Sequence, residues 1–136
     1  MLKSVLKSEQ CAKCKICCSF LKSDVWEAPD FTRNVLNEDS FKNDSEILLC
    51  PALDECKGCT MGKDKPFDCS IWPLRPFYIE GRVRIGVAEI CPELGRDNDG
   101  KLIDLLENGL YDKILSAIKK DKSLVKNHPE GYRIIY

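Results

Sequence analysis

The chain has 136 residues, of which 43% are hydrophobic and 32% charged, and its formal net charge is −1. This length suits a single domain covering residues 1–136. The nearly cancelling charges exclude the basic stripe typical of nucleic-acid-binding proteins and the polybasic patch of a membrane-surface protein. We therefore expect neither nucleic acid nor a membrane among its partners.

The first residues contain no apolar run of signal-peptide length. The longest apolar run, 47–53, is interrupted by Pro51 and is too short to cross a bilayer. A cytoplasmic location is therefore predicted. In a reducing compartment, nine cysteines indicate metal binding or redox chemistry before structural disulfides. The odd count argues in the same direction, as do the adjacent Cys17 and Cys18, which would close a strained ring.

Four cysteines form the run Cys11-x2-Cys14-x2-Cys17-Cys18. Thiolates are soft ligands that suit iron–sulfur clusters and zinc. Successive x2 spacings can place three sulfurs around one cluster, as in ferredoxins. Side chains of neighbouring residues diverge, so Cys18 is expected to serve a second metal or another edge of a larger cluster.

Few regular elements are predicted in the middle of the chain. A short helix capped by Ser23 or Asp24 and a second helix over 30–36 are possible. Residues 46–49 form a short extended piece that ends at Pro51. Residues 54–76 are rich in Gly, Pro, Lys and Cys and predict an irregular loop held by metal ligands.

The second half of the chain has clearer patterns. Alternation predicts a β-hairpin with strands at 77–79 and 82–87 around Glu80-Gly81. After a turn signal at 97–100, apolar residues recur at helical spacing over 100–120, with a break at Asn108-Gly109. The last residues, 133–136, predict a terminal strand. The expected fold is a small, irregular, metal-stapled α+β domain with a short β-hairpin and C-terminal helices.

The remaining cysteines can complete two sets of four ligands within a cysteine-rich region, residues 11–92. Cys91-Pro92 has the form of a ferredoxin's closing Cys-Pro, although it is remote from the run. One arrangement joins Cys91 to the first three cysteines of the run, and the second set contains Cys18, Cys50, Cys59 and Cys69. Cys56 is left over and is interpreted as a bystander. The candidate metal ligands are thus Cys11, Cys14, Cys17, Cys18, Cys50, Cys59, Cys69 and Cys91.

The pattern resembles the YkgJ-like family, also described by its Cys-x2-Cys-x2-Cys-Cys opening, whose members are regarded as zinc- or iron-chelating proteins. The opening cysteines match, Cys50-Pro51-Ala52-Leu53 looks like the family's Cys-x-x-Leu element, and Cys91-Pro92 resembles its closing Cys-Pro. Residues 59–73 follow the spacing of Cys-x-Ile-Tyr-x-x-Arg-Pro-x-x-Cys-Arg-x-aromatic-Pro. The chain departs from that segment at Gly62, Lys65 and Ser70, where the family has Tyr, Arg and Arg.

The resemblance implies a metal site without deciding between iron and zinc. An iron–sulfur protein with a redox, maturation or modification role on another protein is the favoured interpretation. A zinc-binding interaction module without catalysis is the alternative. Some larger proteins with this cysteine pattern resemble lysine methylases, so a group-transfer enzyme stays open. His128, the single histidine, is expected to be solvated, which leaves little material for histidine acid–base chemistry.

Overall fold

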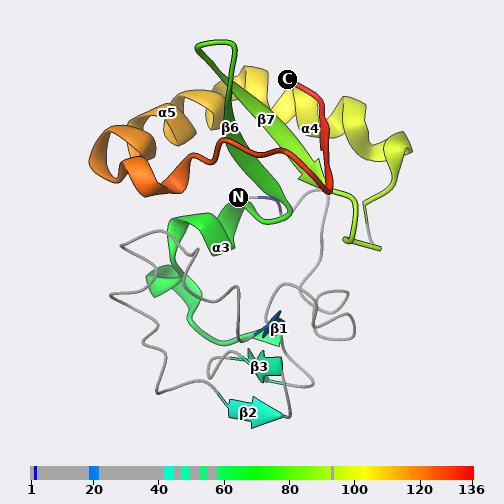
Figure 1. The fold of residues 1–136 in the computed structure, drawn as a ribbon, viewed down its shortest axis with the longest axis vertical. Coiled ribbons are helices and arrows are strands. Elements are labelled where there is room, and N and C mark those ends of the chain that lie inside the picture. Colours follow the sequence, from blue (N-terminus) through cyan, green and yellow to red (C-terminus); the bar gives the residue numbers. More distant parts are fainter. Residues whose placement is uncertain are drawn as a thin grey trace.

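The computed structural model describes Leu2, residues 60–92 and residues 94–136 in full, and the backbone of five short strands between residues 19 and 59. The described part contains an antiparallel three-stranded sheet with two helices along one face (Figure 1). The predicted α+β class is therefore confirmed. The helices expected near Ser23 and Asp24 and over 30–36 lie outside the described residues.

The sheet has the order β6-β7-β8, with β6 at Leu74–Ile79, β7 at Arg82–Ala88 and β8 at Tyr132–Ile134. Glu80 (φ 52°) and Gly81 (φ 76°) form the tight turn between β6 and β7. Two consecutive residues with positive φ match the twist of a two-residue hairpin, which explains the glycine at the second position. The predicted hairpin and terminal strand are both confirmed.

The prediction of an irregular loop over 54–76 is wrong, because regular elements occur in both halves of the segment, beginning with paired strands at Leu53–Asp54 and Gly58–Cys59. A short helical turn at Gly62–Asp64 is followed by helix α3, Phe67–Ile71, and β6 begins at Leu74. Prolines within a run argue against a strand, but Pro76 directs its backbone toward the outer edge of β6. There its carbonyl accepts a hydrogen bond from Lys126 N at 3.1 Å, so the missing N–H costs no bond to β7.

The helical pair is α4, Asp99–Leu105, and α5, Tyr111–Lys120. Asn108 (φ −88°, ψ 22°) and Gly109 (φ 115°) depart from helical geometry between them, as the sequence predicted. The signal at 97–100 marks a helix start instead of a free turn. A single 3-10 turn, Arg96–Asn98, leads directly into α4, and Asn98 Oδ1 accepts a hydrogen bond from Gly95 N.

The core lies between the helices and one face of the sheet. Alternate residues of the hairpin, Leu74, Ile85 and Val87, face the helices, and Leu2 from the start of the chain joins them. Burial of a large apolar side chain stabilises the fold by about 1.5–3 kcal/mol. The helices contribute the inner side chains of both halves of the pair, Leu102, Leu106, Leu110, Ile114 and Ile118.

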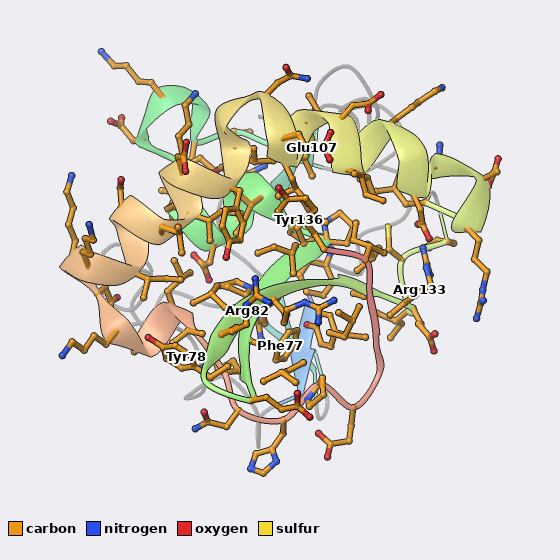
Figure 2. The ribbon with its side chains drawn as sticks, turned by 90° about the horizontal axis from the view of Figure 1, so that it is seen from above. Phe77, Tyr78, Arg82, Glu107, Arg133 and Tyr136 are labelled. Carbon is orange, nitrogen blue, oxygen red and sulfur yellow. The ribbon has the colours of Figure 1, made fainter. Side chains whose placement is uncertain are left out.

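The opposite face of the sheet is crossed by residues 125–131, here called the strap. The strap pairs with the outer edge of β6 through Tyr78 N and Lys126 O at 2.9 Å, and reaches the far edge of the sheet where Glu89 N meets Gly131 O at 2.9 Å. Figure 2 shows it on the side away from the helices, with Phe77 between it and the hairpin. Phe77 is accordingly only 1% exposed.

Two small sheets lie in the cysteine-rich region. One has the order β1-β3-β2, with β1 at Ser19–Leu21, β2 at Lys42–Asp44 and β3 at Ile47–Leu49. The other pairs β4, Leu53–Asp54, with β5, Gly58–Cys59. β3 confirms the extended piece predicted over 46–49.

Candidate metal centre

The structure describes the side chains of two predicted ligands, Cys69 and Cys91. For Cys59 it gives the backbone alone, in β5. The other predicted ligands lie outside the described residues, as does Cys56: these are Cys11, Cys14, Cys17, Cys18 and Cys50. The described geometry of the candidate centre is therefore that of its last two cysteines.

Cys69 lies in the middle of α3 and is half-buried. Pro66 precedes the helix, a position where its missing N–H costs nothing, and its carbonyl accepts a hydrogen bond from Ser70 N at 2.9 Å. The helix ends after one turn and a half, where Trp72 N donates to Asp68 O at 3.1 Å and the cis Trp72–Pro73 peptide follows. The prolines on either side therefore confine Cys69 to a short, defined helix.

Cys91 lies in a turn directly after β7. Its N–H donates to Ala88 O at 3.2 Å, and its side chain belongs to the core cluster with an exposed fraction of 8%. Leu94 and, from α3, Ile71 belong to the same cluster. The neighbouring Ile90 points the other way and is 63% exposed. The turn therefore places the Cys91 thiol inside the fold.

The segments carrying Cys69 and Cys91 meet at one end of the hairpin, opposite the Glu80-Gly81 turn. Leu74 pairs with Val87, and Ala88 N donates to Pro73 O at 2.9 Å. In Figure 1, α3 lies at this lower end of the hairpin, beneath the helical pair. Two cysteines from different sequence segments thus lie at the same end of the hairpin.

Structural zinc and cubane clusters usually have four ligands, so each proposed set has one described ligand, Cys91 in the first and Cys69 in the second. Within residues 60–92 and 94–136, no group of three or more His, Cys, Asp or Glu side chains is placed to hold a metal ion. A metal bound by Cys69 or Cys91 would need further ligands, and the earlier cysteines are the candidates that the sequence predicts. The donor chemistry of those cysteines fits zinc or iron–sulfur ligation.

An aromatic and cationic cluster lies at the same end of the hairpin. The Arg75 guanidinium carbon is 6.0 Å from the Trp72 ring centroid and 5.9 Å from that of Tyr132. Burial raises the pKa of the Tyr132 phenol, and the positive charge of Arg75 opposes that rise. The sequence analysis did not single out Tyr132. The available signal was Gly86, because a glycine inside a strand often marks the close approach of another group.

His128 is highly exposed, with 87% of its side chain accessible beside Glu130, as the sequence predicted. In the described part of the chain, no helix has both the length and the apolar character needed to cross a membrane. No family model matches the chain, and neither the curated proteins nor the solved structures contain a significant match.

Proposed function

We propose that this chain is a cysteine-ligated, cytoplasmic metalloprotein that binds an iron–sulfur cluster and serves the oxidation–reduction, maturation or modification of another protein. The observation that carries the proposal is the number and spacing of its thiols. Eight cysteines with the described spacings can supply two sets of four soft ligands. The position of Cys69 and Cys91 at one end of the hairpin supports it, because each proposed set of four then has one described ligand at the same end of the fold.

The residues proposed to hold the metal are the eight cysteines of the YkgJ-like pattern. Thiolate ligation requires deprotonated cysteines, so binding releases protons and contributes to folding free energy. A bound cluster would supply one-electron chemistry. This chain's own contribution is to hold the ligands, and at Cys91 to exclude water through apolar neighbours such as Leu94.

Zinc is the second candidate. A closed zinc site needs ligands that are fixed in the fold and shielded from solvent. The burial of Cys91 among apolar side chains favours that kind of site. In this case the metal staples an interaction module and takes no part in a reaction.

The deciding experiment is analysis of iron, acid-labile sulfide and zinc in full-length protein purified without oxygen, together with its visible spectrum. Iron with matching sulfide and a reducible absorption band supports the cluster. Stoichiometric zinc in a colourless protein supports the interaction module. Protein that folds without either metal contradicts both.

A pair of variants separates ligation from folding. Cys69→Ser removes one proposed thiolate, and we expect it to lower the metal bound per chain. Leu102→Ala is the matched control, because it damages the core at α4 without removing a sulfur. It is expected to lower the melting temperature while keeping the metal content. Equal metal loss in the two variants would mean that the Cys69 effect reflects unfolding.

A further inference from the structure

Trp72, Arg75 and Tyr132, here called the Arg75 corner, form a compact triangle. The guanidinium carbon of Arg75 is about equally far from both rings, at 6.0 and 5.9 Å, and the ring centroids are 6.4 Å apart. The two rings are nearly perpendicular, with an interplanar angle of 87°. Cation–π attraction acts at such distances and restrains the guanidinium between the rings.

The sheet is built to admit this cluster. A Cβ on Gly86 would lie 3.1 Å from Tyr132 Cβ and 3.0 Å from Phe77 Cε2, so any larger residue would press on the aromatic side chains. The Phe77 ring packs edge-on against the Tyr132 ring, with ring centroids 4.9 Å apart. The position of Tyr132 beside Arg75 is therefore fixed by the backbone of β7 and by a buried ring.

Arg75 differs from Arg84 and Arg133 in its hydrogen bonds, and from the exposed Arg82 and Arg96 in being half-buried beside two rings. Arg133 donates to Asp99, and Arg84 donates to Tyr136 O at 2.8 Å. Arg75 donates to no acceptor in the described part of the chain. Arg75 is half-buried, and no fully buried side-chain nitrogen or oxygen of that part lacks a partner, so its N–H groups are at least partly accessible. A guanidinium held in place with accessible donors is prepared to bind an anion.

We propose that the Arg75 corner is a docking point for an acidic side chain, Asp or Glu, of a partner protein. The planar guanidinium matches the two oxygens of a carboxylate. The flanking rings reduce the ordering cost of binding, and Trp, Tyr and Arg are the residue types that dominate interface energies. A protein carboxylate fits better than nucleic-acid phosphates, because one guanidinium can pair with one carboxylate, whereas a phosphate backbone calls for a stripe of basic residues that the near-balanced charges do not indicate.

The Arg75 corner lies near the two described cysteines in the fold. Trp72 is the residue that ends α3, the helix carrying Cys69, so the corner lies at the hairpin end where Cys91 also lies. An acidic partner held by Arg75 would be placed at the same end of the hairpin as Cys69 and Cys91. The choice of a protein as partner rests on the proposed function, whereas the binding of a carboxylate rests on the geometry of the corner alone.

The test uses fluorescence anisotropy with a labelled peptide of alternating Glu and Gly, and a matched peptide with Gln in place of Glu. Full-length protein is expected to bind the Glu peptide alone. Arg75→Gln should weaken binding at least about tenfold, as expected for loss of one partner in a charged pair. Arg75→Lys, which keeps the charge but loses the planar fork, should recover only part of the affinity.

Arg82→Gln is the matched control, because it removes the same charge from an exposed position at the start of β7. It should change the affinity less than twofold. The proposal is overturned if both variants lose affinity equally, if the Gln peptide binds as well, or if single-stranded DNA binds more tightly than the Glu peptide. Thermal melting of each variant separates loss of the fold from loss of the docking group.

Metal analysis of the same preparations keeps this proposal distinct from the proposed function. Arg75-dependent peptide binding in protein that takes up no metal would leave the docking point standing and remove the metal centre. A metal-loaded protein whose peptide binding is unchanged by Arg75→Gln would support the metal centre and remove the docking point.

Discussion

Arg133 and Asp99 connect the last strand to the start of the first C-terminal helix through two parallel hydrogen bonds. Arg133 Nη2 lies 2.7 Å from Asp99 Oδ1, and Arg133 Nε lies 3.0 Å from Asp99 Oδ2. The side chains are only 14% and 23% exposed. The hydrogen bond to Asp99 raises the pKa of the Arg133 guanidinium, which is therefore charged throughout the working pH range.

Loss of this pair should destabilise the protein. Arg133→Gln leaves the Asp99 carboxylate largely buried without its charged donor, and such losses cost about 1–3 kcal/mol. We expect a drop of that size in the free energy of unfolding, measured by urea denaturation. Arg82→Gln removes an exposed arginine and should stay within about 0.5 kcal/mol of the native chain. Equal effects in the two variants would show that the pair contributes nothing specific.

A second prediction concerns the glycine that faces Tyr132. Gly86→Ala places a Cβ 3.0–3.3 Å from Phe77, Tyr132 and Ile134, and crowding of this kind costs about 1–3 kcal/mol. Gly100→Ala is the control, because a Cβ in the first turn of α4 meets nothing within 4 Å. It should stabilise the chain by up to about 1 kcal/mol. Thermal melts that shift in opposite directions would confirm the difference, and parallel shifts would contradict it.

The sequence predicted β7, α4 and α5 better than it predicted β6. Alternation in β7 and helical spacing in α4 and α5 report which side chains face the core, so those elements were predictable. β6 was not fully predictable, because Pro73 and Pro76 argue against a strand unless its outer edge and the strap are known. The start of α4 was predicted as a turn, because Asn and Gly are common both in turns and at helix starts.

The sequence could predict the type of ligand in the candidate centre, but it could not predict which cysteines lie close together. Cysteine spacing identifies soft ligands, but convergence depends on contacts between distant segments. The hydrogen bond between Ala88 and Pro73 sets the segments of Cys69 and Cys91 at one end of the hairpin. The proposed division of cysteines into two sets of four stays a prediction. The Arg75 corner was also hidden, because its three residues come from separate elements.

The helical pair provides a prediction about the core. Ile114 of α5 is fully buried in the core between the helices and the sheet. Ile114→Ala should lower the free energy of unfolding by about 2–5 kcal/mol through lost contacts and a residual cavity. The matched substitution is Ile90→Ala, at a side chain that is 63% exposed. It should change the free energy of unfolding by less than about 0.5 kcal/mol. A large cost at Ile90 would indicate that its side chain is covered in solution.

Tyr132 predicts a dependence of stability on alkaline pH. Burial raises its pKa above the usual value of about 10, so the unfolded chain releases the phenol proton at lower pH than the folded chain. The unfolded state then binds fewer protons, and stability falls as pH rises beyond about 10. Tyr132→Phe should reduce this fall in chemical denaturation measured across pH 8–11. Equal slopes for the native chain and Tyr132→Phe would remove Tyr132 as its source.

Cys91 can be tested separately as a metal ligand and as a core residue. Its side chain packs in the apolar cluster, so Cys91→Val keeps a buried apolar group while removing the thiolate. If the sulfur binds metal as proposed, the variant should lose metal while the helices persist in circular dichroism. Ile85→Val is the control for altered packing, at a cost of about 0.5–1.5 kcal/mol, and should keep its metal. Full metal content in Cys91→Val would assign Cys91 to the core alone and leave the centre to the remaining cysteines.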